Sequence, residues 1–121
     1  MPRYAQELTD AEEIAIWEKI LEREGTTFVT SGRENTPGVS FTYEIPVYRM
    51  EGKTVKGAEL RISSRSKTIT RSTVMLAHRR VKEILEAGEE IKGPKQLGVY
   101  GSSYLFAIFR EVGVIPGNII R

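Results

Sequence analysis

The residues best suited to bind a ligand lie in one stretch that is rich in bases and hydroxyls. Phosphates on nucleic acids are contacted by Arg and Lys, by Ser and Thr hydroxyls, and by amides at helix N-termini. Residues 61–82 offer all three kinds of donor, with seven bases, one histidine and no acid. The bases are Arg61, Arg65, Lys67, Arg71, Arg79, Arg80 and Lys82. The sequence therefore predicts a polyanion-binding face in this stretch.

An alternative explanation of the same charges stays open. The first 24 residues hold seven acids against three bases, so an acidic first helix is able to balance a solvated basic helix. The binding interpretation expects Arg71, Met75, His78 and Lys82 to form one helical stripe that follows a nucleic-acid backbone. Its predicted contacts are Arg61, Arg65, Lys67, Thr70, Arg71, Ser72, Arg79, Lys82 and Arg110.

Catalysis is poorly supported by the residue types present. The chain has no cysteine and a single histidine, His78, and its single aspartate is Asp10. Metal sites and Ser-His-Asp triads draw on several such residues, and both of these have helix positions that explain them. The segment Gly93–Gly98 has the glycine spacing of a P-loop, but Val99 and Tyr100 stand where Lys and Ser or Thr are required. We therefore predict no catalytic residue, no metal, no cofactor and no enzyme activity.

Length and composition indicate one domain spanning residues 1–121. The mass is 13.7 kDa, the net charge is +2 and 40% of the residues are hydrophobic, which is typical of globular chains. No apolar run approaches the roughly 18–20 residues of a membrane span, and the polar start is unlike a targeting peptide. These features favour a cytoplasmic protein with no membrane partner.

Hydrophobic periodicity predicts an α+β fold. The sequence indicates an N-terminal helix over residues 10–24, a three-stranded antiparallel meander, and two or three C-terminal helices. Thr9 and Glu12 form a capping box at the first helix, where Ile14, Trp17 and Leu21 share a face and Trp17 is expected to be buried against the sheet.

The strands are predicted over residues 26–31, 39–47 and 58–63, with a turn at residues 51–52. Pro46 indicates a sheet edge or bulge, and Gly57 a bulge. A long helix is predicted from its N-cap Thr70 to residue 87, a short turn or helix over residues 93–97, and a last helix over residues 103–112.

Residues 97–115 resemble the second half of a helix-turn-helix. The resemblance rests on the Leu97-Gly98-Val99 turn that leads into a helix and on the Gly113-Val114-Ile115 step that follows it. It implies that Ser102, Ser103, Phe106 and Arg110 face a groove, and that Leu105, Ile108 and Val112 belong to the core. The chain as a whole resembles small uncharacterised proteins of Gram-positive bacteria and their mobile elements, which implies no particular activity.

Two functions of different class follow from these patterns. The first is a small DNA-binding regulatory or accessory protein that uses the basic strand–turn–helix face. The second is a protein-interaction or assembly module, a homodimer or a partner of another protein, that uses the aromatic C-terminal helix and the hydrophobic tail after it. A continuous positive face favours the first function, and an exposed apolar patch favours the second.

Overall fold

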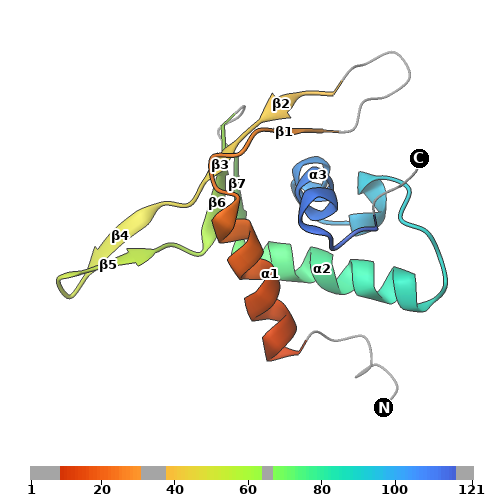
Figure 1. Ribbon diagram of the computed structural model, residues 1–121, viewed down its shortest axis with the longest axis horizontal. Helices are drawn as coiled ribbons and strands as arrows, with labels where there is room; N and C mark the ends of the chain where they lie inside the picture. Colours follow the sequence, from red (N-terminus) through yellow and green to blue (C-terminus); the bar gives the residue numbers. More distant parts are fainter. Residues whose placement is uncertain (1–8, 31–37, 64–66, 117–121) are drawn as a thin grey trace.

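The computed structural model describes residues 9–30, 38–63 and 67–116 (Figure 1). These residues form helices α1 (Asp10–Glu22), α2 (Arg71–Glu86) and α3 (Ser102–Val112), and the 3-10 helix η2 (Pro94–Leu97). The strands are β1 (Phe28–Val29), β2 (Ser40–Phe41), β3 (Tyr43–Glu44), β4 (Val47–Met50), β5 (Lys53–Lys56), β6 (Glu59–Ile62) and β7 (Lys67–Thr70). The α+β class is thus confirmed.

The strands do not form the single meander that the sequence predicts. They form three small antiparallel sheets, β1–β2, β3–β6–β7 and β4–β5. The alternating stretch over residues 39–47 buries Phe41, Tyr43 and Ile45 as expected, but Val39 and Val47 are more than half exposed. Strand β7 lies where the sequence predicts a turn and the start of a helix.

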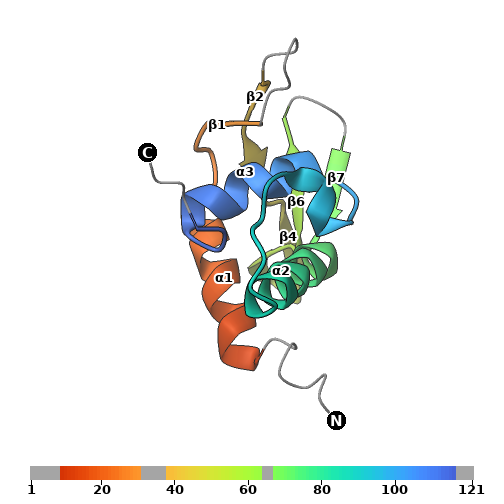
Figure 2. The ribbon, with the colours of Figure 1, turned by 90° about the vertical axis from the view of Figure 1, so that its right-hand side faces the viewer.

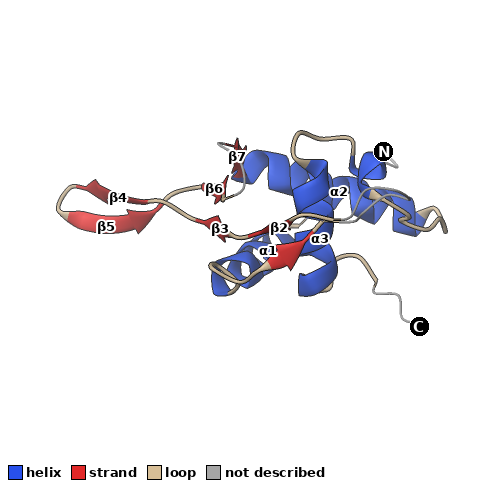
Figure 3. Cartoon of the chain, turned by 90° about the horizontal axis from the view of Figure 1, so that it is seen from above, coloured by secondary structure: helices blue, strands red, loops and turns tan. Residues whose placement is uncertain are grey.

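The β4–β5 hairpin leaves the body of the protein at a bulge. Glu44 pairs with Arg61 in the sheet, and the Gly57 N–H donates to the Pro46 carbonyl at 2.7 Å. Between these two pairs, the first side of the ribbon has one residue, Ile45, and the opposite side has three, residues 58–60. Such a mismatch bends a ribbon and ends its regular pairing. Figure 3 shows the hairpin extending away from the helices.

Helix α1 begins as predicted and buries a different face. The Thr9 hydroxyl accepts from the Glu12 N–H, and the Glu12 carboxylate accepts from the Thr9 N–H, which confirms the capping box. The residues buried by α1 are Ile16 and Ile20, whereas Trp17 is only partly buried. The expected burial of Trp17 is thus partial, with its side chain packed against the core, whereas Ile14, which the sequence places on the same face, is 53% exposed.

Helix α3 forms the centre of the molecule (Figure 2). It contacts α1, α2, η2 and β1, and it ends at Gly113, whose φ is +87°. Its buried residues are Tyr104, Leu105, Phe106, Ala107, Ile108, Phe109 and Val112. The Phe41 ring meets the Tyr104 ring edge-on at 4.9 Å, and Phe28 stacks on Phe41 at 5.6 Å. An aromatic cluster therefore joins α3 to the first two strands.

Candidate interaction surfaces

The predicted nucleic-acid stripe of α2 faces helix α1. The Arg71 guanidinium lies 5.5 Å from the centre of the Trp17 ring and 4.0 Å from the Glu13 carboxylate. Met75, which the sequence places on the same outward stripe, is only 4% exposed. The stripe therefore forms part of a helix–helix interface, which the spacing of residues along α2 could not reveal.

The second base of the stripe is also paired with α1. The Lys82 ammonium donates to the Glu12 carboxylate at 3.1 Å. The pKa of Glu12 is lowered, first by the backbone hydrogen bond from Thr9 and then by Lys82. Glu12 thus caps its own helix and ties it to α2. For Arg71 and Lys82, the geometry agrees with the alternative in which the acidic first helix balances the basic one.

The other predicted contacts are dispersed over several elements. Arg61 lies on the exposed face of β6, 3.6 Å from the Glu59 carboxylate. The Thr70 hydroxyl caps α2 by accepting from the Thr73 N–H, and it also hydrogen-bonds the Ser72 hydroxyl. Arg65 lies outside the described residues, and Lys67 is described only as backbone in β7. The Arg110 guanidinium, on α3, lies 5.5 Å from the centre of the Phe106 ring.

Arg79 lies on a different face of α2 from Arg71 and Lys82. It lines a groove of about 450 Å³ between α2 and the turn after η2, together with Arg80 and Val99. Arg80 is held by the Glu83 carboxylate at 3.2 Å and by the Gln96 carbonyl. The Arg79 Nε is buried and has no hydrogen-bond partner among the described residues. Arg79 therefore differs from Arg71 and Lys82, because it has no carboxylate partner among the described residues.

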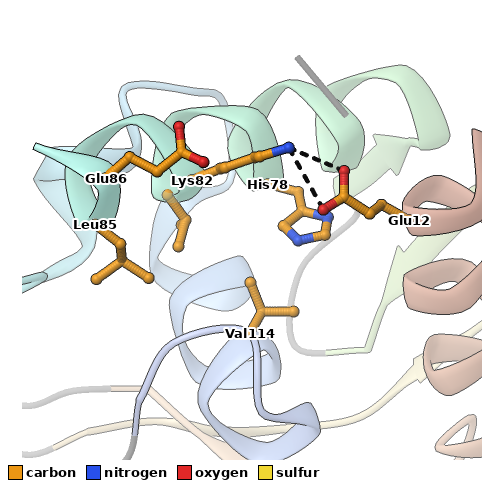
Figure 4. Close-up of a pocket in the computed structure, with 7 residues that line it drawn as sticks. Glu12, His78, Lys82, Leu85, Glu86 and Val114 are labelled. Carbon is orange, nitrogen blue, oxygen red and sulfur yellow. Dashed lines mark hydrogen bonds and ion pairs between the residues drawn. The ribbon is translucent and has the colours of Figure 1, made fainter. Parts of the chain in front are cut away.

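The single histidine lines a small pocket between α1, α2 and the segment after α3 (Figure 4). The pocket measures about 250 Å³, and its charged wall is the Glu12–Lys82 pair. Burial lowers the pKa of His78, and its Nδ1 has no partner among the described residues. No group of three or more His, Cys, Asp or Glu in residues 9–30, 38–63 and 67–116 is arranged to hold a metal ion.

The aromatic C-terminal helix is not an exposed interaction surface. Phe106, which the helix-turn-helix resemblance turns toward a groove, is only 4% exposed. Ser103 and Arg110 are exposed and Ser102 is half-buried. The apolar residues of α3 therefore complete the core, as do Leu105, Ile108 and Val112 in agreement with the same resemblance.

Among the described residues, the β4–β5 hairpin carries four of the exposed large apolar side chains, Val47, Tyr48, Met50 and Val55; the others, such as Ile14, Val29 and Leu76, are distributed over other elements. All eight strand residues of the hairpin are exposed, and Met50 and Val47 reach 60% and 53%. The register places Tyr48, Met50, Lys53 and Val55 on one face and Val47, Arg49, Thr54 and Lys56 on the other. The sequence held a signal for this element, because apolar residues occupy both faces around the Glu51-Gly52 turn.

The base of the hairpin is firmly attached to the body. The Glu24 carboxylate accepts from the Ile45 N–H at 2.7 Å and from the Lys56 ammonium at 2.6 Å. These two hydrogen bonds, the larger one from Lys56, lower the pKa of Glu24. The Gly25 N–H also donates to the Tyr43 carbonyl at 3.1 Å. The end of α1 therefore closes the outer edge of β3, up to the point where β4 begins.

The comparisons with known proteins give no indication of the function of this chain. No family model, no curated protein and no solved structure matches this chain. Within the described residues, no helix has the length and apolar character needed to span a bilayer.

Proposed function

We propose that this protein is an assembly module that binds a second copy of itself through the β4–β5 hairpin. The observation that carries the proposal is the exposure of apolar residues on both faces of a ribbon outside the core. Val47, Tyr48, Met50 and Val55 are 41–60% exposed. A two-stranded hairpin alone in water is marginally stable, and contiguous exposed apolar residues typically mark a protein contact.

Electrostatics favour this proposal over a polyanion-binding face. The bases expected to form that face are largely offset by carboxylates: Arg61 by Glu59, Arg80 by Glu83, and Arg71 and Lys82 by α1. The hairpin itself carries three bases, Arg49, Lys53 and Lys56, and one acid, Glu51 at the tip; Lys56 is held by Glu24 from outside the hairpin. A ribbon with four exposed apolar side chains fits a protein partner better than a phosphate backbone.

Sedimentation equilibrium tests the proposal directly. We expect the average mass to rise from 13.7 kDa toward twice that value as the concentration increases from micromolar to about millimolar. The double variant Met50→Thr with Val55→Thr keeps β propensity and removes apolar surface, so we expect it to weaken self-association at least tenfold.

The matched control removes apolar surface elsewhere. Ile14 and Leu76 are 53% and 50% exposed on α1 and α2, and the double variant Ile14→Gln with Leu76→Gln should change self-association less than twofold. A parent protein that stays monomeric up to millimolar concentration contradicts the proposal. So does equal weakening by both double variants.

Nucleic-acid binding is the second candidate, and Arg79 is the observation that favours it. Arg79 lies near the start of a groove beside Leu76, with a guanidinium Nε that lacks a partner among the described residues. The first turn of α2 contains no acid, and Ser72 lies two helical turns before Arg79 on the same face. This face of α2, rather than the stripe toward α1, is where a phosphate would meet an arginine that has no carboxylate partner among the described residues.

A salt titration with duplex DNA tests this second candidate. We expect Arg79→Gln to flatten the slope of log affinity against log salt by about 0.9, the value for one phosphate contact. Arg71→Gln is the control, because its guanidinium is engaged with Trp17 and Glu13, and it should leave the slope unchanged. Absence of binding near 50 mM salt, or an equal effect of the two variants, rejects the candidate.

A further inference from the structure

The β4–β5 hairpin has one backbone edge whose peptide groups are exposed and unpaired. The Glu51-Gly52 turn closes the Met50–Lys53 pair, and the Gly57 N–H bonds the Pro46 carbonyl. Hydrogen-bonded pairs alternate along an antiparallel ladder, so Pro46, Tyr48 and Met50 direct their available peptide groups toward β5. The peptide groups of Val47 and Arg49 therefore point away from β5, and they have no partner among the described residues.

The same edge is closed farther back along the chain. Tyr43 and Ile45 direct their peptide groups to the same side, where Gly25 and the Glu24 carboxylate occupy them. The open part of this edge thus consists of β4 alone. The outer edge of β5 begins and ends with Lys53 and Lys56, and lysines on an edge strand disfavour pairing with another strand.

From this edge we infer that two copies pair antiparallel through β4, with Tyr48 on the two-fold axis; the inference rests on the proposed function. The new contact extends each two-stranded ribbon into a ribbon of four strands ordered β5–β4–β4–β5. Val47 of each copy then lies opposite Arg49 of the other, and each of these two pairs exchanges both backbone hydrogen bonds.

The neighbouring registers are less favourable for identifiable reasons. A register centred on Arg49 places the two guanidinium groups directly opposite each other, and like charges in that position destabilise a sheet. A register centred on Val47 requires the Ile45 N–H, which already donates to Glu24. The register centred on Tyr48 avoids both problems, and it brings the two Tyr48 rings together on the face that carries Met50 and Val55.

Disulfide trapping tests the register in a chain that has no cysteine of its own. Tyr48 of one copy would lie opposite Tyr48 of the other copy in a non-hydrogen-bonded pair. The two Cα atoms of such a pair lie about 4.5 Å apart. That separation is within the range for a disulfide. We expect the Tyr48→Cys variant to form a covalent dimer in mild oxidant, and at least tenfold faster than the control variant Val55→Cys.

Val55 is a matched control because it is the cross-strand neighbour of Tyr48 and is equally exposed, at 41% against 42%. In the proposed ribbon the two Val55 residues lie on the outer strands, about 14 Å apart at the usual strand spacing. Equal rates for the two cysteine variants would indicate random collision and would overturn the inferred pairing.

A backbone substitution tests the β4 edge without relying on cysteine chemistry. Arg49→Pro removes an outward N–H and no hydrogen bond to β5, and proline is tolerated at such edge positions. We expect it to weaken self-association at least tenfold relative to Arg49→Gln, which keeps the N–H. Two-dimensional NMR of the monomer verifies that the hairpin is retained.

The outcomes separate the two proposals. If the parent self-associates but Arg49→Pro matches Arg49→Gln and Tyr48→Cys is not trapped, the β4 edge is wrong and the assembly function stands. If the parent shows no self-association at all, both proposals fail together.

Discussion

Helix α3 and the β4–β5 hairpin both carry more apolar residues than a single buried face requires. In α3 these residues are buried, whereas in the hairpin they are exposed. Helix α3 is contacted by α1, α2, η2 and β1, so its residues from Tyr104 to Phe109 are all buried. The hairpin extends beyond the bulge at Pro46 and Gly57, and all eight of its strand residues are exposed. Apolar residues therefore form the core in α3 and an exposed surface in the hairpin.

This difference shows that the surroundings of an element decide the fate of its apolar residues. The sequence pattern favours the aromatic C-terminal helix as an interaction surface, because an all-round apolar helix either completes a core or meets a partner. The number of neighbours decides between these outcomes, and it depends on contacts between segments that are distant in the chain.

The largest expected effect comes from removing a ring at the centre of α3. Phe109 is fully buried, and Phe109→Ala should lower the free energy of unfolding by about 3–5 kcal/mol, since it leaves a cavity. Urea denaturation measures the change. A loss below about 1 kcal/mol, the level of an ordinary substitution, would mean that α3 is not the central element of the core.

A somewhat smaller effect is expected at the start of α3. Gly101 has a φ of +75°, and a Cβ there would lie 2.5 Å from the Ile69 side chain. We expect Gly101→Ala to cost about 2–4 kcal/mol, because it adds left-handed strain to displacement of a buried residue.

Gly88→Ala is the control for that substitution. Gly88 has a φ of +80°, and a Cβ added there would have no neighbour within 4 Å among the described residues, so strain alone should cost about 1–2 kcal/mol. Equal losses for the two alanine variants, measured by the same denaturation, would show that α3 does not pack closely on β7.

The next effect appears only on acidification. Burial lowers the pKa of His78 in the folded state, whereas in the unfolded chain it stays near 6.5. The unfolded state therefore binds more protons below about pH 6.5, and stability should fall as the pH decreases from there.

Thermal melts at pH 7.5 and pH 5.5 measure this dependence. The groups that face His78 are Glu12 and Glu13 of α1, Lys19 of α1 and Lys82 of α2. The pKa values of Glu12 and Glu24 are lowered, so these carboxyl groups change protonation below the usual carboxyl range. They therefore do not contribute to the change in stability between pH 7.5 and pH 5.5. His78→Leu should therefore reduce the pH dependence. An unchanged dependence would locate the titrating group elsewhere.

The smallest effect is expected in the hairpin. Met50 is 60% exposed, and Met50→Thr should change the stability of the monomer by less than about 0.5 kcal/mol, as is usual for surface positions. Denaturation at low micromolar concentration measures it. A loss comparable to that of Phe109→Ala would show that the hairpin packs on the core.

Local features of the fold could be predicted from the sequence. The capping box of Thr9 and Glu12, the Thr70 cap, the Glu51-Gly52 turn and the stop at Gly113 involve neighbours within a few residues, and all are present. The division into three sheets could not be predicted, because it depends on how residues 58–60 bulge opposite Ile45.

The candidate surfaces were less predictable for the same reason. Arg71 and Lys82 have the spacing of a continuous basic stripe, and the spacing carries no information about α1 lying against it. The orphan Nε of Arg79 depends on the position of η2, which is distant in sequence. Residue types indicated which side chains are suited to anions, and tertiary packing placed Arg71 and Lys82 beside carboxylates of α1.

The Glu24 carboxylate, by closing the strand edge at Ile45, limits how far strand addition can proceed. With the peptide groups of Tyr43 and Ile45 occupied, the described edge that runs along β3 and β4 offers a second chain the open peptide groups of Val47 and Arg49. A pairing of that kind is isologous, so each copy consumes the surface that a third would need. In the inferred dimer, the outer edges of the four-stranded ribbon are the lysine-bordered β5 strands, so this ribbon is protected against the open-ended growth that long unprotected strand edges promote.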